Sequence, residues 1–112
     1  ASVLADVKPT NVAAREEIFG PVAAVIRVGS ADEAVDVANG SRFGLGASLW
    51  TRDLAKAEKL AARIEAGAVF VNGLVKSDPR LPFGGVKASG YGRELGLEGI
   101  RSFCNAKTVW IK

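Results

Sequence analysis

The chain has 112 residues, of which 48% are hydrophobic and 24% are charged, which is typical of one globular domain and excludes a disordered chain. Its net charge of +3 arises from Lys and Arg residues interspersed with Asp and Glu, which argues against a nucleic-acid-binding surface. No apolar run reaches the roughly 20 residues of a membrane-spanning helix, and the start of the chain lacks signal-peptide features.

Apolar runs in the first half of the chain predict strands over residues 2–7, 22–28 and 47–51, the second of them covered on both faces. Residues 10–15 have a polar start followed by alanines, which predicts one helical turn. Ser30 and Glu33 have the spacing of a capping box, so a helix is expected to begin there and to end at Gly40.

In the second half, Asp53 is expected to cap a helix with an apolar stripe that ends near Gly67; the stripe is Leu54, Ala57, Leu60, Ala61 and Ile64. We further predict a buried strand over residues 68–71, a long loop over 72–89, a short helix over 93–100 and a terminal strand over 102–111. Helices between apolar strands favour an α/β fold with parallel strand pairs.

One part of the long loop is unusually rich in glycine: residues 81–95 read LPFGGVKASGYGREL. Such density indicates turns with positive φ or a close approach of the backbone to another group, although a plain connecting loop is the alternative. This stretch resembles the C-terminal signature of NAD(P)-dependent aldehyde dehydrogenases, and EEIFGPV at residues 16–22 resembles a second signature of that family. The ending FCNAKTVW, at residues 103–110, is similar to bacterial succinate-semialdehyde dehydrogenases.

The resemblance covers essentially the whole chain and implies the C-terminal part of an α/β catalytic domain with a three-layer, mostly parallel sheet and flanking helices. Residues 1–88 would belong to that domain, 89–103 to a connecting helix region and 104–112 to an oligomerisation strand. The first residue is not methionine, and we expect a fragment of a longer homo-oligomeric enzyme that uses NAD or NADP. The parent enzyme would oxidise an aldehyde, such as succinate semialdehyde, to the acid.

The resemblance also assigns four site residues. It implies that Glu17 binds the nicotinamide ribose, that Phe19 packs near the nicotinamide, that Phe83 lines the substrate tunnel and that Ser77 donates a hydrogen bond to the substrate carboxylate. A carboxylate can bridge two ribose hydroxyls, and a hydroxyl can donate to a carboxylate. Taken singly, Glu17 could be a solvated carboxylate, Phe83 a core aromatic and Ser77 a turn residue. Arg80 is a further candidate partner for a carboxylate by its charge.

No catalytic residue and no metal site is predicted within the chain. In the resembling family the nucleophilic Cys and the general-base Glu lie N-terminal to the matched residues, and the chain has no histidine. The one cysteine, Cys104, lies in an apolar pattern and is expected to be structural. A single cysteine excludes an internal disulfide and favours a reducing compartment, the cytoplasm. The chain alone should therefore be inactive.

Two other functions remain open on the sequence. The missing nucleophile is also compatible with a free-standing, non-catalytic oligomerisation or binding module. The isoelectric point of about 9.3 is compatible with a small nucleic-acid binder, which salt-dependent DNA binding would reveal. The residue that reads the ribose 2′-position is absent, so the choice between NAD and NADP is open as well.

Overall fold

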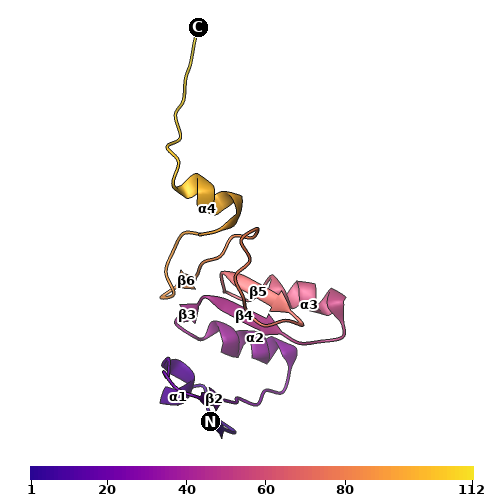
Figure 1. Cartoon of the computed structure of the whole chain (residues 1–112). Helices are drawn as coiled ribbons and strands as arrows, with labels where there is room; N and C mark the ends of the chain where they lie inside the picture. Colours follow the sequence, from indigo (N-terminus) through magenta and orange to yellow (C-terminus); the bar gives the residue numbers. More distant parts are fainter.

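The computed structural model describes residues 1–112 (Figure 1). Its elements, in chain order, are β1 (Ser2–Leu4), α1 (Val12–Arg15), β2 (Val22–Ala24), α2 (Ala31–Asn39), β3 (Phe43–Gly44), β4 (Gly46–Leu49), α3 (Leu54–Ala61), β5 (Ala68–Val71), β6 (Val86–Lys87) and α4 (Gly96–Ser102). None of these helices has the length and apolar character needed to cross a membrane. The alternation confirms the predicted α/β class.

The strands form three separate two-stranded sheets rather than one large sheet. β1 pairs with β2, and β4 pairs with β5, both in parallel, with α3 as the connection between β4 and β5. β3 and β6 pair antiparallel, with Phe43 opposite Lys87. The predicted parallel pairs are therefore present, and the β3–β6 pair was not predicted because two-residue strands show no periodicity.

Side-chain caps set the starts of α2 and α3, as the sequence indicated, whereas α4 begins at Gly96 rather than at residue 93 and has no side-chain cap. Ser30 Oγ accepts a hydrogen bond from the Glu33 N–H at 3.1 Å, and Asp53 Oδ1 accepts from the Lys56 N–H at 2.9 Å. The Glu33 carboxylate accepts from the N–H of Gly29, at 2.6 Å, and not from that of Ser30, so the capping box is displaced by one residue. These bonds satisfy N–H groups that a helix start leaves without partners.

Several elements are shorter than predicted. β1 ends at Leu4 and β2 at Ala24, and the residues of β2 are exposed instead of being covered on both faces. α3 ends at Ala61, so Gly67 follows the helix at a distance and does not end it. Just beyond the end of α3, the Arg63 carbonyl accepts from the side chain of Asn39, at the end of α2, at 2.8 Å.

The hydrophobic core is small. Only five of the 112 residues are buried, and two of these five, Val35 and Ala57, form the hydrophobic core. A chain of this length normally removes about two thirds of its unfolded surface from water on folding. The apolar faces of the helices are present as predicted, but the two-stranded sheets are too narrow to cover them. The core is therefore smaller than expected, and β5, which has the predicted bounds, is half-buried over residues 68–70 and exposed at Val71.

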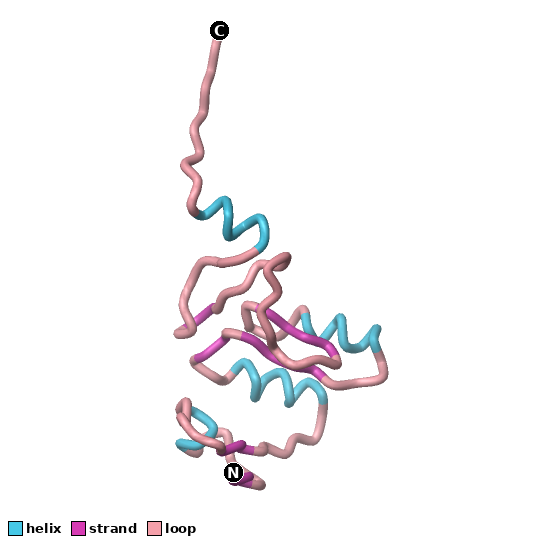
Figure 2. The backbone as a smooth tube through the Cα atoms, in the orientation of Figure 1, coloured by secondary structure: helices cyan, strands magenta, loops and turns pink.

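The end of the chain differs most from its predicted structure. α4 runs to Ser102, and residues 103–112 form no strand and project away from the remaining elements as an extended segment (Figures 1 and 2). Phe103 is 92% exposed and Trp110 is 85% exposed. The predicted strand over residues 102–111 is wrong for this chain by itself, because a strand needs a partner for its backbone groups and none lies alongside.

Candidate functional site

The two signature segments, residues 16–22 and 81–95, meet at the short strand β3. β6 lies within the second segment and pairs with β3. Arg42, directly before β3, donates to Glu16 Oε2 in the first segment at 2.7 Å. The fold therefore brings together two stretches that are more than fifty residues apart in the sequence.

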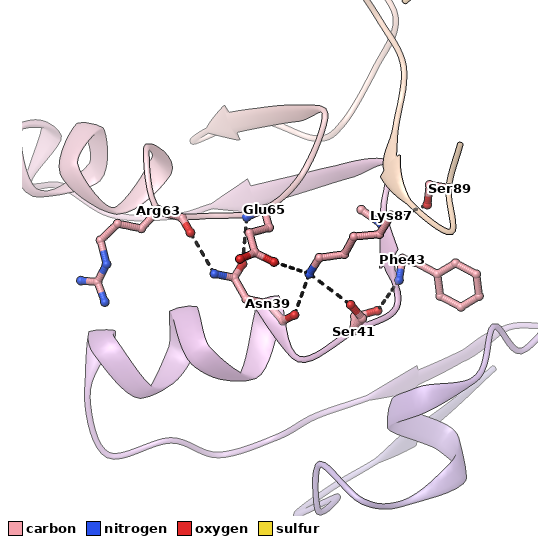
Figure 3. A network of polar contacts seen from close by, with 8 residues as sticks. Asn39, Ser41, Phe43, Arg63, Glu65, Lys87 and Ser89 are labelled. Carbon is pink, nitrogen blue, oxygen red and sulfur yellow. Dashed lines mark hydrogen bonds and ion pairs between the residues drawn. The ribbon is translucent and has the colours of Figure 1, made fainter. Parts of the chain in front are cut away.

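Lys87 fixes the second segment to the body of the protein (Figure 3). Its ammonium group donates to the carbonyl of Asn39 at 2.6 Å and to the carbonyl of Ser41 at 3.2 Å. It also forms an ion pair with Glu65 Oε2 at 2.7 Å. The three ammonium protons have three acceptors, and the Lys87 side chain is only 24% exposed. β6 is thereby tied to the end of α2 and to the turn that follows α3.

The neighbours of Lys87 continue this network. Ser89 Oγ accepts from the Gly44 N–H at 3.0 Å. The Asn39 amide bridges the turn after α3, because its Nδ2 donates to the Arg63 carbonyl and its Oδ1 accepts from the Glu65 N–H, both at 2.8 Å (Figure 3). The walls around β3 are therefore held by side chains as well as by strand pairing.

The glycines of the second segment are explained by close backbone contacts and by turns. A Cβ atom added at Gly67 would lie 1.6 Å from the Gly84 carbonyl oxygen, so β5 begins directly against this segment. Gly90 and Gly92 have φ values of +109° and +80°, which L residues rarely adopt. The segment is thus a packed loop, as its glycine density indicated, and not a plain connector.

A cavity of about 610 Å³ opens beside β3. Both signature segments line it, and so do β3 and the turn after α3; among the lining residues are Glu16, Glu17, Ser41, Phe43, Glu65 and Ser89. The Glu17 side chain is exposed and takes part in none of the hydrogen bonds or ion pairs of the structure. It is therefore an unpaired carboxylate at the edge of a cavity.

The other three predicted site residues do not line this cavity. Phe19 is 93% exposed. Phe83 is half-buried and is held by two backbone hydrogen bonds with Glu94, each of 2.8 Å. Ser77 is exposed, and its hydroxyl has no partner in the structure. The structure thus brings only Glu17 to the cavity and leaves Phe19 and Ser77 free on the surface.

Arg80 already has a carboxylate partner within the chain. Its Nε and Nη2 atoms donate to the two carboxylate oxygens of Asp78, at 2.9 and 2.6 Å. The side-chain hydrogen bond from Arg80, followed by the one from its backbone N–H, lowers the pKa of Asp78 to about 2. Asp78 is therefore charged at neutral pH, and the pair persists beside Ser77.

Cys104 has no base or cation in contact with it. It is exposed, and its thiol donates to the Ile100 carbonyl at 3.4 Å, as expected near the end of a helix. Cys104 follows α4, however, and does not lie in the strand that the sequence predicted.

Sequence reasoning missed two residues that organise the site. Lys87 lies inside the recognised signature, but nothing in its position revealed that it reaches Asn39 and Glu65. Arg42 precedes a two-residue strand, where no periodic pattern exists to mark it. Only the fold places it beside Glu16.

The sequence of the chain is similar to those of known proteins. The aldehyde dehydrogenase family profile matches residues 1–109. Over 110 residues the chain is 54% identical to succinate-semialdehyde dehydrogenase [NADP(+)] 1 of Mycobacterium tuberculosis and 56% identical to a probable succinate-semialdehyde dehydrogenase [NADP(+)] of Synechocystis. Each match includes 98% of this chain and 24% of the relative.

Solved structures show the same similarity. The succinic semialdehyde dehydrogenase of Streptococcus pyogenes, in complex with NADP+, matches 94% of this chain and 23% of that protein, with a TM-score of 0.89 and 44% identity. A Mycobacterium tuberculosis aldehyde dehydrogenase complexed with NAD+ matches 90% of this chain and 21% of that protein, with a TM-score of 0.85 and 44% identity. The chain belongs to the aldehyde dehydrogenase family. It spans about a quarter of the length of the relatives that it matches.

Proposed function

We propose that this chain is a segment of an NADP-dependent dehydrogenase that oxidises succinate semialdehyde to succinate. The observation that carries the proposal is the unpaired Glu17 carboxylate at the edge of the cavity beside β3, within the EEIFGPV signature. Two relatives support the choice of aldehyde and cofactor. Their names give this reaction, and more than half of their matched residues are identical to those of the chain.

The cofactor side of the site consists of Glu17 and Phe19. An ionised carboxylate only accepts hydrogen bonds, and Glu17 has no partner, so it can accept from two ribose hydroxyls. The Phe19 ring is 93% exposed and is free to cover the nicotinamide. Bound NADP+ supplies the acceptor for the hydride that leaves the substrate. The residues that are present therefore fit the cofactor.

The substrate side of the site consists of Ser77 and Phe83. The Ser77 hydroxyl can donate to the carboxylate of succinate semialdehyde, since no group in the structure occupies it. The backbone of Phe83 is held by Glu94 through its N–H and its carbonyl, so its ring can form part of the wall of the substrate site. We place the enzyme in the cytoplasm, because the one cysteine of this segment is exposed and unpaired.

The nucleophile and base of the reaction would come from the part of the enzyme that precedes this segment. The chain alone should therefore not reduce NADP+. To test the function, a chimaera is made in which this segment replaces the matched 110-residue stretch of the Mycobacterium tuberculosis relative. The formation of NADPH by the chimaera is then followed with succinate semialdehyde as the substrate.

We expect the chimaera to be active, to remain active after Cys104→Ser, and the isolated chain to be inactive. A folded, inactive chimaera, or activity of the isolated chain that depends on Cys104, would contradict the proposal. Inactivity of the isolated chain is also what a non-catalytic module would show, so the chimaera is the arm that separates the two functions.

Ser77→Ala in the chimaera should impair succinate semialdehyde more than butanal, which lacks a carboxylate. A hydrogen bond to a charged group contributes about 1.5–3 kcal/mol, which corresponds to a relative loss in kcat/KM of about 10- to 100-fold. Ser77→Thr keeps the hydroxyl and serves as the control. Equal losses on both aldehydes would show that Ser77 does not read the carboxylate.

The segment from residue 102 to 112 is proposed to pair with a second subunit. Val109, Trp110 and Ile111 are 70%, 85% and 88% exposed, and an apolar segment of this kind gains from burial against another chain. Deletion of residues 103–112 should shift the chimaera to a smaller oligomer in analytical ultracentrifugation. If the deletion variant has the same number of subunits as the unmodified chimaera, this segment is excluded from the interface.

A further inference from the structure

Arg42 is the residue at which the two signature segments meet. Its guanidinium donates to Glu16 Oε2 at 2.7 Å, and its carbonyl accepts from the Ala88 N–H at 2.9 Å. Its guanidinium carbon also lies 4.6 Å from the centre of the Phe43 ring, a distance at which a cation is attracted to the ring face. No other residue bonds to both segments.

The first signature segment has few other attachments. None of the backbone N–H groups of residues 17–20 donates to another backbone group, and the Glu16–Arg42 pair is the only side-chain bond that the segment makes. The position of Glu17 therefore depends on Glu16 more than on any contact of its own.

The backbone conformation at Glu16 connects the two carboxylates. Glu16 has φ −109° and ψ 148°, which is extended backbone. Successive side chains point to opposite sides of an extended backbone. Glu17 follows Glu16 directly along this backbone, so fixing the Glu16 side chain on Arg42 also restrains the orientation of the Glu17 side chain.

We infer that Arg42 is a positioning residue for the cofactor: it holds Glu16 and thereby orients Glu17 toward the nicotinamide ribose. The inference rests on the proposed role of Glu17. Arg42 has a second effect in the same direction, because it neutralises one of two adjacent carboxylates. Without it, both charges would repel the phosphates of a bound dinucleotide.

Exposure limits how large this effect can be. The side chains of Arg42 and Glu16 are 60% and 53% exposed, so solvent screens their attraction. Pairs of this kind change an equilibrium by about two- to fivefold. The loss should appear in cofactor binding, because the folded protein has the Ala88 bond and the β3–β6 pairing whether or not the ion pair forms.

The experiment is a double-mutant cycle on the chimaera, with the dissociation constant of NADP+ measured by calorimetry in the absence of aldehyde. The variants are Arg42→Gln, Glu16→Gln and the double variant. Arg27→Gln is the matched control, because Arg27 forms an exposed ion pair with Asp6, at 3.2 Å, away from the cavity. Thermal unfolding of each variant is recorded alongside.

Arg42→Gln should raise the dissociation constant about two- to fivefold, and Arg27→Gln should not change it. The double variant should bind no more weakly than Arg42→Gln, because both changes break the same contact. Arg42→Lys, which keeps the charge, should recover part of the loss. KM for the aldehyde should be unchanged in the whole series.

Three results would overturn the inference. The Arg42→Gln variant could bind NADP+ as tightly as the Arg27→Gln control, or the effects of Arg42→Gln and Glu16→Gln could be additive. The third is a loss of NADP+ binding that is fully explained by a lower melting temperature. Glu17→Gln separates this failure from failure of the proposed function. If Glu17→Gln weakens NADP+ binding while Arg42→Gln does not, the ribose role of Glu17 stands and the positioning role of Arg42 falls. If neither variant changes binding, both fall.

Discussion

Replacing Gly67 with alanine is expected to destabilise the chimaera by about 3 kcal/mol or more, at the upper end of what overpacking produces. The added Cβ would lie 1.6 Å from the Gly84 carbonyl oxygen and 2.7 Å from the carbon of that carbonyl. Both are backbone atoms, so no side chain can rotate away. The start of β5 and the second signature segment would have to separate.

The effect is measured as the free energy of unfolding in urea. Gly20→Ala is the matched control, because a Cβ at Gly20 meets no atom within 4 Å and should change the stability by less than about 1 kcal/mol. Hydrogen exchange should increase around residues 84–86 in the Gly67 variant alone. Equal unfolding free energies for the two variants would mean that the approach of Gly67 to Gly84 is not present in the folded enzyme.

The starts of α2 and α3 could be predicted because their signals are local. The Ser30–Glu33 and Asp53–Lys56 bonds join residues three positions apart, so the sequence alone contains both partners. The β3–β6 pair joins Phe43 to Lys87. No local pattern encodes such a pairing, and two residues are too few to show the alternation of a strand.

Periodicity also predicted more burial than the structure contains. It identifies the apolar face of a helix, but not whether another element packs on that face. Leu54 begins the apolar stripe of α3 and is nevertheless 65% exposed. Of the stripe, only Ala57 is buried in the core. The predicted strand lengths were wrong for a related reason. β2 has one neighbouring strand, and it ends where its pairing with that strand ends.

A motif named the candidate residues of the site, and the roles that it implies for them stay predictions. EEIFGPV marked Glu17, and the structure leaves that carboxylate unpaired at the cavity. The motif could not indicate what holds the segment in place. Arg42 and Lys87 act through contacts that span 26 and 48 residues of sequence. Such contacts depend on the packing of α2 and β3, which the sequence does not state.

Glu17→Gln is expected to lower kcat/KM for NADP+ by about 10- to 100-fold in the chimaera, which is the loss of a charged hydrogen bond worth about 1.5–3 kcal/mol. The amide is nearly isosteric with the carboxylate, but it carries no charge and has only one acceptor oxygen for two ribose hydroxyls. The nicotinamide would then be held less accurately, and a small misplacement of reacting atoms is costly to the rate.

The thermal unfolding midpoint of the Glu17→Gln variant should match that of the unmodified chimaera, because Glu17 has no hydrogen bond or ion pair to lose. Glu58→Gln is the matched control: Glu58 lies in α3, is exposed and forms no ion pair, so it should alter neither quantity. The pair of variants separates a local role in binding the ribose from a general effect of removing one negative charge. Identical kinetics for Glu17→Gln and Glu58→Gln would remove Glu17 from the cofactor site.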